Sequence, residues 1–150
     1  MDRIFGDAED FGEALEGMTE QFKTNEVQII RRRLPYTEEM RPKVVQHILM
    51  IAASMFRSHP KVTHLPNAVE LPNRFIFRVA LCTYLLGHRW MSVGGAKQVK
   101  PTNIRNDLID VIFAAYATYF DGILSADKKL NAIYRGVRFA LDNVFIRPTG

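Results

Sequence analysis

The sequence has very little cysteine and no long apolar run, and each absence excludes a class of structure. Cys82 is the single cysteine among 150 residues, so neither an intramolecular disulfide nor a cysteine-based zinc site can form. It lies in the apolar segment FIFRVALCTYLL, which predicts a buried, inert thiol. No apolar run reaches about 18 residues, and the acidic start MDRIFGDAEDFGEALE does not resemble a signal peptide. These absences predict a soluble, cytoplasmic protein without a membrane span.

The composition favours a single globular domain over residues 1–150. Apolar residues make up 47% of the chain and charged residues 24%, a balance typical of a folded protein. The formal charge of +4 permits polyanion binding without demanding it, although basic residues cluster at Arg31 to Arg33 and between Lys97 and Arg105. The four histidines show no metal-binding spacing, so packing or surface roles are favoured for them.

Three- and four-residue apolar spacing predicts a largely helical chain. The segment 27–36 fits either a short strand or a helix, and Thr37 resembles the N-cap of the helix that follows it. Residues 58–73 form the clearest loop. Gly94-Gly95 is expected to end the helix that follows this loop, over about residues 72–92. Predicted helices cover residues 7–23, 44–56 (apolar on most sides and therefore central), about 72–92, Thr102 or Asn106 to about 120, and 126–141.

Two short apolar segments near the end of the chain predict a sheet. GILS (residues 122–125) and NVFI (residues 143–146) fit buried strands separated by one helix, and two strands connected in this way form a right-handed parallel unit. The expected fold is therefore α/β, mostly helical with a small parallel sheet. The single domain would consist of a helical part, residues 1–65, and an acidic-motif α/β part, residues 66–150.

Aspartates surround the first of these expected strands. Asp107 and Asp110 are three residues apart and share one helix face, and Asp127 follows GILS where open α/β sheets place their ligands. Carboxylates without imidazoles favour Mg²⁺ or Mn²⁺. Aspartates are equally common as helix caps and dipole partners, and spacing alone does not separate the two roles. Asp121, at the opposite end of GILS, is expected to be a turn or cap residue.

The segment DVIFAAYATYFDGILSAD, residues 110–127, resembles the C-terminal half of a PIN-domain nuclease. Asp110 stands before an alanine-rich helix, and Ser125-Ala126-Asp127 matches the strand-end signature of that family. The resemblance implies metal-dependent hydrolysis of RNA phosphodiesters, with Asp110 and Asp127 as catalytic metal ligands. It further implies that Asp107 is either an additional ligand or an acid that supports the ligands from behind, and that Ser125 is an orienting hydroxyl.

RNA is the implied substrate and partner. Arg105, Lys128 and Lys129 are near enough in sequence to contact phosphates, although Lys128 could equally neutralise the acids. The first, aspartate-ending strand of the family has no counterpart here, and nothing selects a glutamate from Glu13, Glu16, Glu20 and Glu26. An N-terminally incomplete chain, a degenerate relative, or a homodimer or protein partner that completes the sheet would each explain this.

A second hypothesis comes from a different functional class. The chain could be a non-catalytic RNA-binding or protein-interaction domain that retains a degenerate PIN-like fold. Tyr116, Tyr119 and Phe120 recur at helical spacing, which favours core packing over base stacking.

Overall fold

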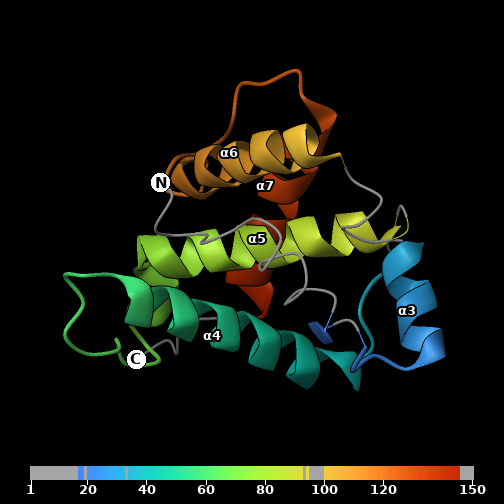
Figure 1. Ribbon diagram of the computed structural model, residues 1–150, viewed down its shortest axis with the longest axis horizontal. Coiled ribbons are helices and arrows are strands. Elements are labelled where there is room, and N and C mark those ends of the chain that lie inside the picture. The colour runs from blue at the N-terminus through green and yellow to red at the C-terminus, as the bar shows by residue number, and fades with distance from the viewer. Residues whose placement is uncertain (1–16, 19, 33, 93, 95–99, 146–150) are drawn as a thin grey trace.

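Regular structure in the computed structural model is entirely helical over the residues that it describes, which are 17–18, 20–32, 34–92, 94 and 100–145 (Figure 1). The elements in chain order are α3 (Thr24–Arg31), α4 (Met40–Ser58), the 3₁₀ turn η1 (Leu71–Asn73), α5 (Phe75–Ser92), α6 (Pro101–Ala117) and α7 (Lys128–Asn143).

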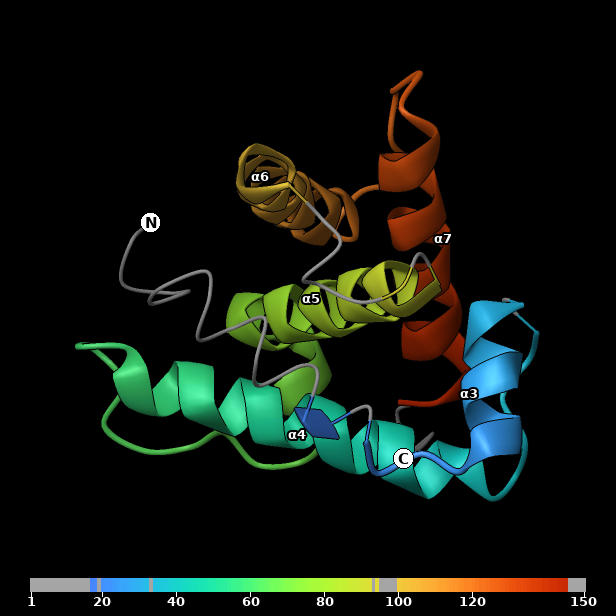
Figure 2. The ribbon, with the colours of Figure 1, turned by 45° about the vertical axis from the view of Figure 1, so that its right-hand side comes forward.

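Helix α5 is the centre of the molecule, and it contacts α3, α4, α6 and α7. Figure 1 shows α4 and α6 on opposite sides of α5, and Figure 2 shows α7 crossing α5 steeply. Phe77, Leu81 and Leu86 of α5 are completely buried. A helix that is apolar on nearly all sides is stable only when other elements surround it, which explains its position. The prediction that residues 44–56 form the central helix is therefore wrong, since α4 exposes Leu49 and Met50.

The helix boundaries mostly follow local sequence signals. The expected helix over 72–92 is confirmed as η1 followed by α5, and Gly94 after its end has a φ of 109°, a conformation that favours glycine. The helix expected at 44–56 begins earlier, at Met40, and its N-cap is Glu39. The cap expected at Thr37 is therefore wrong, although the Thr37 hydroxyl accepts from the Met40 N–H at 3.3 Å. Helix α6 begins at Pro101, a residue suited to the first helical position, so the caps expected at Thr102 or Asn106 are wrong.

Two earlier segments have different outcomes. The segment 27–36, open between strand and helix, supplies the second half of α3 and ends in an irregular connection to α4. Most of the helix expected over residues 7–23 lies outside the described residues, as do Glu13 and Glu16.

The predicted parallel sheet is wrong, and with it the α/β fold class and the PIN-domain resemblance, because the described residues contain no strand. GILS is an irregular connection between α6 and α7, and its Leu124 is fully exposed. Asn143 is the last residue of α7, and the Val144 N–H continues the helical pattern by donating to the Ala140 carbonyl at 2.8 Å. Ile146, the last residue of NVFI, lies outside the description. A single extended segment without a pairing strand gains no ladder hydrogen bonds, so GILS remains a loop.

None of the helices within the described part of the chain is long and apolar enough to cross a membrane.

Candidate functional site

The aspartates of α6 point toward α7, where a lysine pairs with both of them. Asp107 is only 6% exposed, and its Oδ2 accepts a 2.9 Å hydrogen bond from the indole Nε1–H of Trp90. Its Oδ1 pairs with the ammonium group of Lys129, and Asp110 Oδ2 lies 3.3 Å from the same Nζ. Burial lowers the pKa of Lys129, but hydrogen bonds to Asp107 and Asp110 and their charges outweigh it and raise that pKa. The carboxylates that lie around one cationic group are therefore those of Asp107 and Asp110, around Lys129, and not the expected pair of Asp110 and Asp127.

Asp127 has a different role, because its carboxylate is the N-cap of α7. Its Oδ1 accepts from the backbone N–H groups of Lys129 at 2.8 Å and Leu130 at 2.9 Å. The Leu130 N–H, followed by the Lys129 N–H and the Lys129 charge, lowers the pKa of Asp127 despite partial desolvation. These contacts satisfy two of the otherwise unpaired donors at a helix start.

Ser125 belongs to the same cap. Its hydroxyl accepts from the Asp127 N–H at 3.1 Å, and its carbonyl accepts from the Asn131 side chain at 2.7 Å. The Ser-Ala-Asp signature is therefore the entry to a helix, and the structure does not place it at the end of a strand.

No group of three histidine, cysteine, aspartate or glutamate side chains is arranged to hold a metal ion within the described ranges. Lys128 and Arg105, the predicted phosphate contacts, are exposed. The lysine that neutralises the acids is Lys129 and not Lys128, because one residue turns a helical side chain by about 100° and directs Lys128 to solvent.

A buried set of histidine–tyrosine pairs was not among the residues expected from the sequence to be functional. Tyr36 and His88 share a 2.6 Å hydrogen bond, and His47 Nδ1 lies 2.8 Å from the Tyr84 hydroxyl. The second nitrogen of His47, Nε2, lies 2.9 Å from Gln21 Oε1. Desolvation lowers the pKa of His88 to about 3 and also lowers that of His47, so both rings are neutral at physiological pH. The positions of His47 and Tyr84 on apolar helix faces were the available signal.

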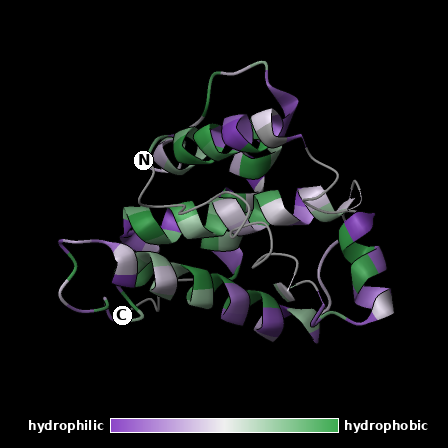
Figure 3. Cartoon of the chain, in the orientation of Figure 1, coloured by the Kyte–Doolittle hydropathy of each residue, from purple (hydrophilic) through white to green (hydrophobic). Residues whose placement is uncertain are grey.

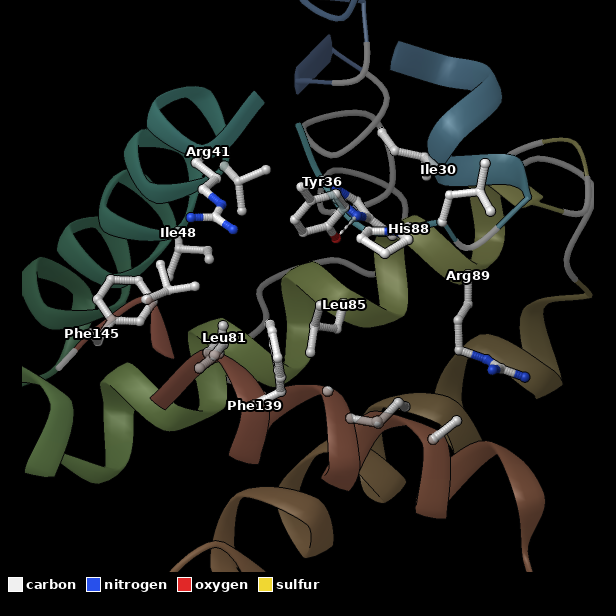
Figure 4. Close-up of a pocket in the computed structure, with 18 residues that line it drawn as sticks. Ile30, Tyr36, Arg41, Ile48, Leu81, Leu85, His88, Arg89, Phe139 and Phe145 are labelled. Carbon is white, nitrogen blue, oxygen red and sulfur yellow. Dashed lines mark hydrogen bonds between the residues drawn. The ribbon is translucent and has the colours of Figure 1, made fainter. Parts of the chain in front are cut away.

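The Tyr36–His88 pair lies beside an apolar pocket of about 450 Å³ (Figure 4). Residues of α3, α4, α5 and α7 form its walls, including Ile30, Ile48, Leu85 and Phe139. Among the residues that the structure describes, its lining includes Arg41 and Arg89 and no acidic residue.

The largest exposed apolar feature of α6 is on the side away from the core. Its inner side buries Leu108, Val111, Ala114 and Ala115 against the neighbouring helices. The opposite side exposes a row of large apolar side chains, defined here as the α6 stripe: Ile109 (37% exposed), Phe113 (60%), Tyr116 (55%) and Phe120 (68%), the last just beyond the helix. In Figure 3, apolar colouring recurs along α6 as it does along the enclosed α5.

The prediction that Tyr116, Tyr119 and Phe120 form core is wrong, since all three are exposed.

Contacts made by Arg78 hold the C-terminal end of α6 in place. The buried Arg78 donates from Nη1 to the Thr118 carbonyl at 2.8 Å, and its guanidinium lies 3.9 Å above the Tyr119 ring. A cation at the C-terminus of a helix is also favoured by the helix dipole. The α6 stripe is therefore held on a rigid element.

Comparisons of the chain with protein families, with curated proteins and with solved structures find no match.

Proposed function

We propose that this chain is a non-catalytic protein-interaction domain whose binding surface is the α6 stripe. The observation that carries the proposal is the exposure of Ile109, Phe113 and Tyr116 along one side of α6, together with that of Phe120 just beyond its end. Large apolar side chains that lie together on a surface mark a binding site, whereas scattered ones do not. A helix that is apolar on two opposite sides is expected where another surface covers the second side.

The chemistry of the stripe favours a protein over RNA as the partner. Surfaces that bind single-stranded RNA combine stacking aromatic rings with a cationic groove that follows the phosphates. Helix α6 contains one basic residue, Arg105, and two acidic ones. An amphipathic helix or another apolar protein surface can bury the stripe, and such a partner does not require a series of cations on this chain.

Site-specific photo-crosslinking in cells that produce the protein tests this proposal. A benzoylphenylalanine at Tyr116 is expected to form a discrete adduct with protein, and Phe113→Asp is expected to abolish that adduct. Val69→Asp is the matched control, because Val69 is 61% exposed and lies in the connection before η1, outside the stripe. Adducts formed with RNA, or protein adducts that are insensitive to Phe113→Asp, would contradict the proposal.

Metal-dependent RNA hydrolysis stays a prediction, and one observation supports it as a second candidate. Asp107 and Asp110 do direct their carboxylates to a single cationic group, the ammonium of Lys129. Mg²⁺ or Mn²⁺ would have to displace Lys129, and Asp127 would have to leave the α7 cap.

An RNA-cleavage assay across a Mn²⁺ titration, with wild type and the Asp110→Asn/Asp127→Asn variant, tests metal-dependent hydrolysis. Cleavage that needs no metal, or that the double variant retains, would exclude this site as the catalyst.

A further inference from the structure

The apolar pocket beside Tyr36 and His88 is space that the packing of the helices leaves unfilled. Helices α3, α4 and α7 each pack on α5. The side of α7 that lines the pocket carries Ala132, Gly136 and Ala140, which are one small residue per turn. Because such short side chains do not reach the opposite wall, about 450 Å³ stays open, a volume typical of sites for small molecules.

The pocket has a buried floor and an exposed apolar rim. Its floor includes Ile48, Leu81 and Ile133, each at most 1% exposed. Its rim includes Leu34 and Phe139, which are 49% and 63% exposed. An apolar molecule in the pocket would remove surface of both rim residues from water, and that burial favours binding. The occupant is therefore expected to have an apolar body.

The charges around the pocket indicate the other end of its occupant. Tyr36 and His88 bond to each other, and burial raises the pKa of Tyr36 and lowers that of His88 to about 3, so both are neutral at physiological pH. Within the described lining the charged groups are Arg41 and Arg89, and both are cationic. Figure 4 shows Arg41 reaching from α4 toward Tyr36, whereas Arg89 points away from the Tyr36–His88 pair. Arg41 is therefore the cation that an anionic head group would meet.

Arg41 retains donors for such a head group. Its Nη1 lies 3.4 Å from Glu38 Oε1, but the side chains of Arg41 and Glu38 are 55% and 89% exposed. Exposed ion pairs contribute little free energy, and one carboxylate engages at most two of the five N–H donors of a guanidinium. An anion at the apolar rim can therefore pair with Arg41 beside Glu38 or in its place.

We propose that this pocket binds an amphipathic carboxylate, a small molecule with an apolar body and one carboxylate group. The body lies against Ile48, Leu81 and Leu85, and the carboxylate pairs with Arg41 at the rim. None of the described lining residues belongs to α6. The site is thus separate from the α6 stripe, and the inference does not rest on the proposed interaction function.

Isothermal titration calorimetry with three probes of equal chain length tests the proposal. The probes are octanoate, 1-octanol and octyltrimethylammonium. Wild type is expected to bind octanoate at a single site with a dissociation constant of about 0.1 mM. Octanol and octyltrimethylammonium should each bind about tenfold more weakly or worse, because the first lacks the charge that pairs with Arg41 and the second is repelled by it.

Three variants locate the bound molecule. Arg41→Gln is expected to weaken octanoate binding about tenfold and to leave octanol within about twofold of wild type. Arg57→Gln, an exposed arginine of the same helix that is not in the described lining, should change neither affinity. Gly136→Leu fills the pocket, since even a Cβ there meets Leu85 Cδ1 at 3.0 Å, and should weaken both probes at least about tenfold.

Octanoate binding weaker than about 5 mM, or equal affinity for octyltrimethylammonium, would overturn the proposal. So would octanoate binding that Arg41→Gln leaves unchanged, or that Phe113→Asp in the α6 stripe abolishes instead. Circular dichroism checks that each variant is folded. If Gly136→Leu unfolds, Arg41→Gln still decides the outcome, because it changes an exposed side chain.

Discussion

At the scale of single residues, the buried imidazoles connect stability to pH. His88 is 9% exposed and hydrogen-bonded to Tyr36, and its pKa in the folded chain is about 3, below the ordinary 6.5. Between these two values the unfolded chain binds a proton that the folded chain does not. The free energy of unfolding therefore rises with pH across this window, and the contribution of His88 to it is lost as the pH falls.

Within this window, His88 alone is expected to lower the free energy of unfolding by about 1.4 kcal/mol for each unit by which the pH falls. His47 acts in the same direction, since its pKa is also lowered. Urea unfolding between about pH 6.5 and 5 isolates the histidines, because Glu26, whose pKa is lowered from 4.5, loses its contribution only at lower pH. His88→Asn should reduce the slope, and the same change at the exposed His64 should not. An identical slope in both variants would contradict the assignment.

The ion pair between Lys129 and Asp107 is the second feature at this scale. Asp107 is buried and depends on Lys129 and Trp90 for partners. Lys129→Met keeps the aliphatic stem and removes the charge, so it is expected to cost about 3 kcal/mol of unfolding free energy. Lys128→Met, one residue earlier and exposed, should change it by less than about 0.5 kcal/mol. Equal effects in chemical denaturation would show that the pair is not the cause.

At the scale of elements, helix α7 depends on its cap. Asp127 satisfies two backbone donors at the start of α7, and its negative charge lies at the positive end of the helix dipole. We expect Asp127→Ala to lower the unfolding free energy by about 1 kcal/mol. Asp127→Asn, which preserves an oxygen acceptor, should lose only part of that amount.

This comparison also separates a structural role for Asp127 from a catalytic one. A capping residue tolerates asparagine, whereas a ligand to Mg²⁺ or Mn²⁺ requires the carboxylate. Equal destabilisation by Asn and Ala in thermal unfolding would contradict the cap.

Helix α3 is stabilised by a charged pair with α4. Glu26, 1% exposed, accepts from the Lys43 ammonium at 2.8 and 3.0 Å and from the Lys23 N–H at 2.8 Å. The Lys43 and Lys23 hydrogen bonds lower the pKa of Glu26 against the effect of burial. The pair therefore fastens α3 to α4 while the pH stays above the folded pKa of Glu26.

At the scale of the whole molecule, α5 makes the fold cooperative. Its contacts with α3, α4, α6 and α7 mean that a change at its centre reaches every other major helix. Leu81→Ala, at a position that is fully buried, is expected to cost about 3 kcal/mol.

The unfolding of that variant should remain a single transition. The one tryptophan, Trp90, reports the contact between α5 and α6, while circular dichroism reports all helices. Coincident midpoints by both probes are expected. Separate midpoints would show that α6 and α7 unfold independently of α3 and α4.

How much of the fold was predictable depends on the range of the interactions involved. The helices over 40–58, 75–92 and 128–143 were largely predictable because capping, proline position and three- to four-residue apolar spacing act within a few residues. The strands were not, since 122–125 forms a strand only if a distant segment pairs with it. Of the candidate site, the shared face of Asp107 and Asp110 followed from spacing, but their partner did not.

The sequence by itself determined that this chain forms amphipathic and apolar helices and that Asp127 stands at a helix start. Only the tertiary structure decided that Lys129 forms ion pairs with the aspartates of α6, and that Tyr36 forms a hydrogen bond with His88, 52 residues away. It also decided which of the two apolar sides of α6 is buried: Val111 is in the core and Phe113 is in solvent. The physical reason is that burial is a competition among all the apolar faces of the chain for one core, and no local window contains the competitors.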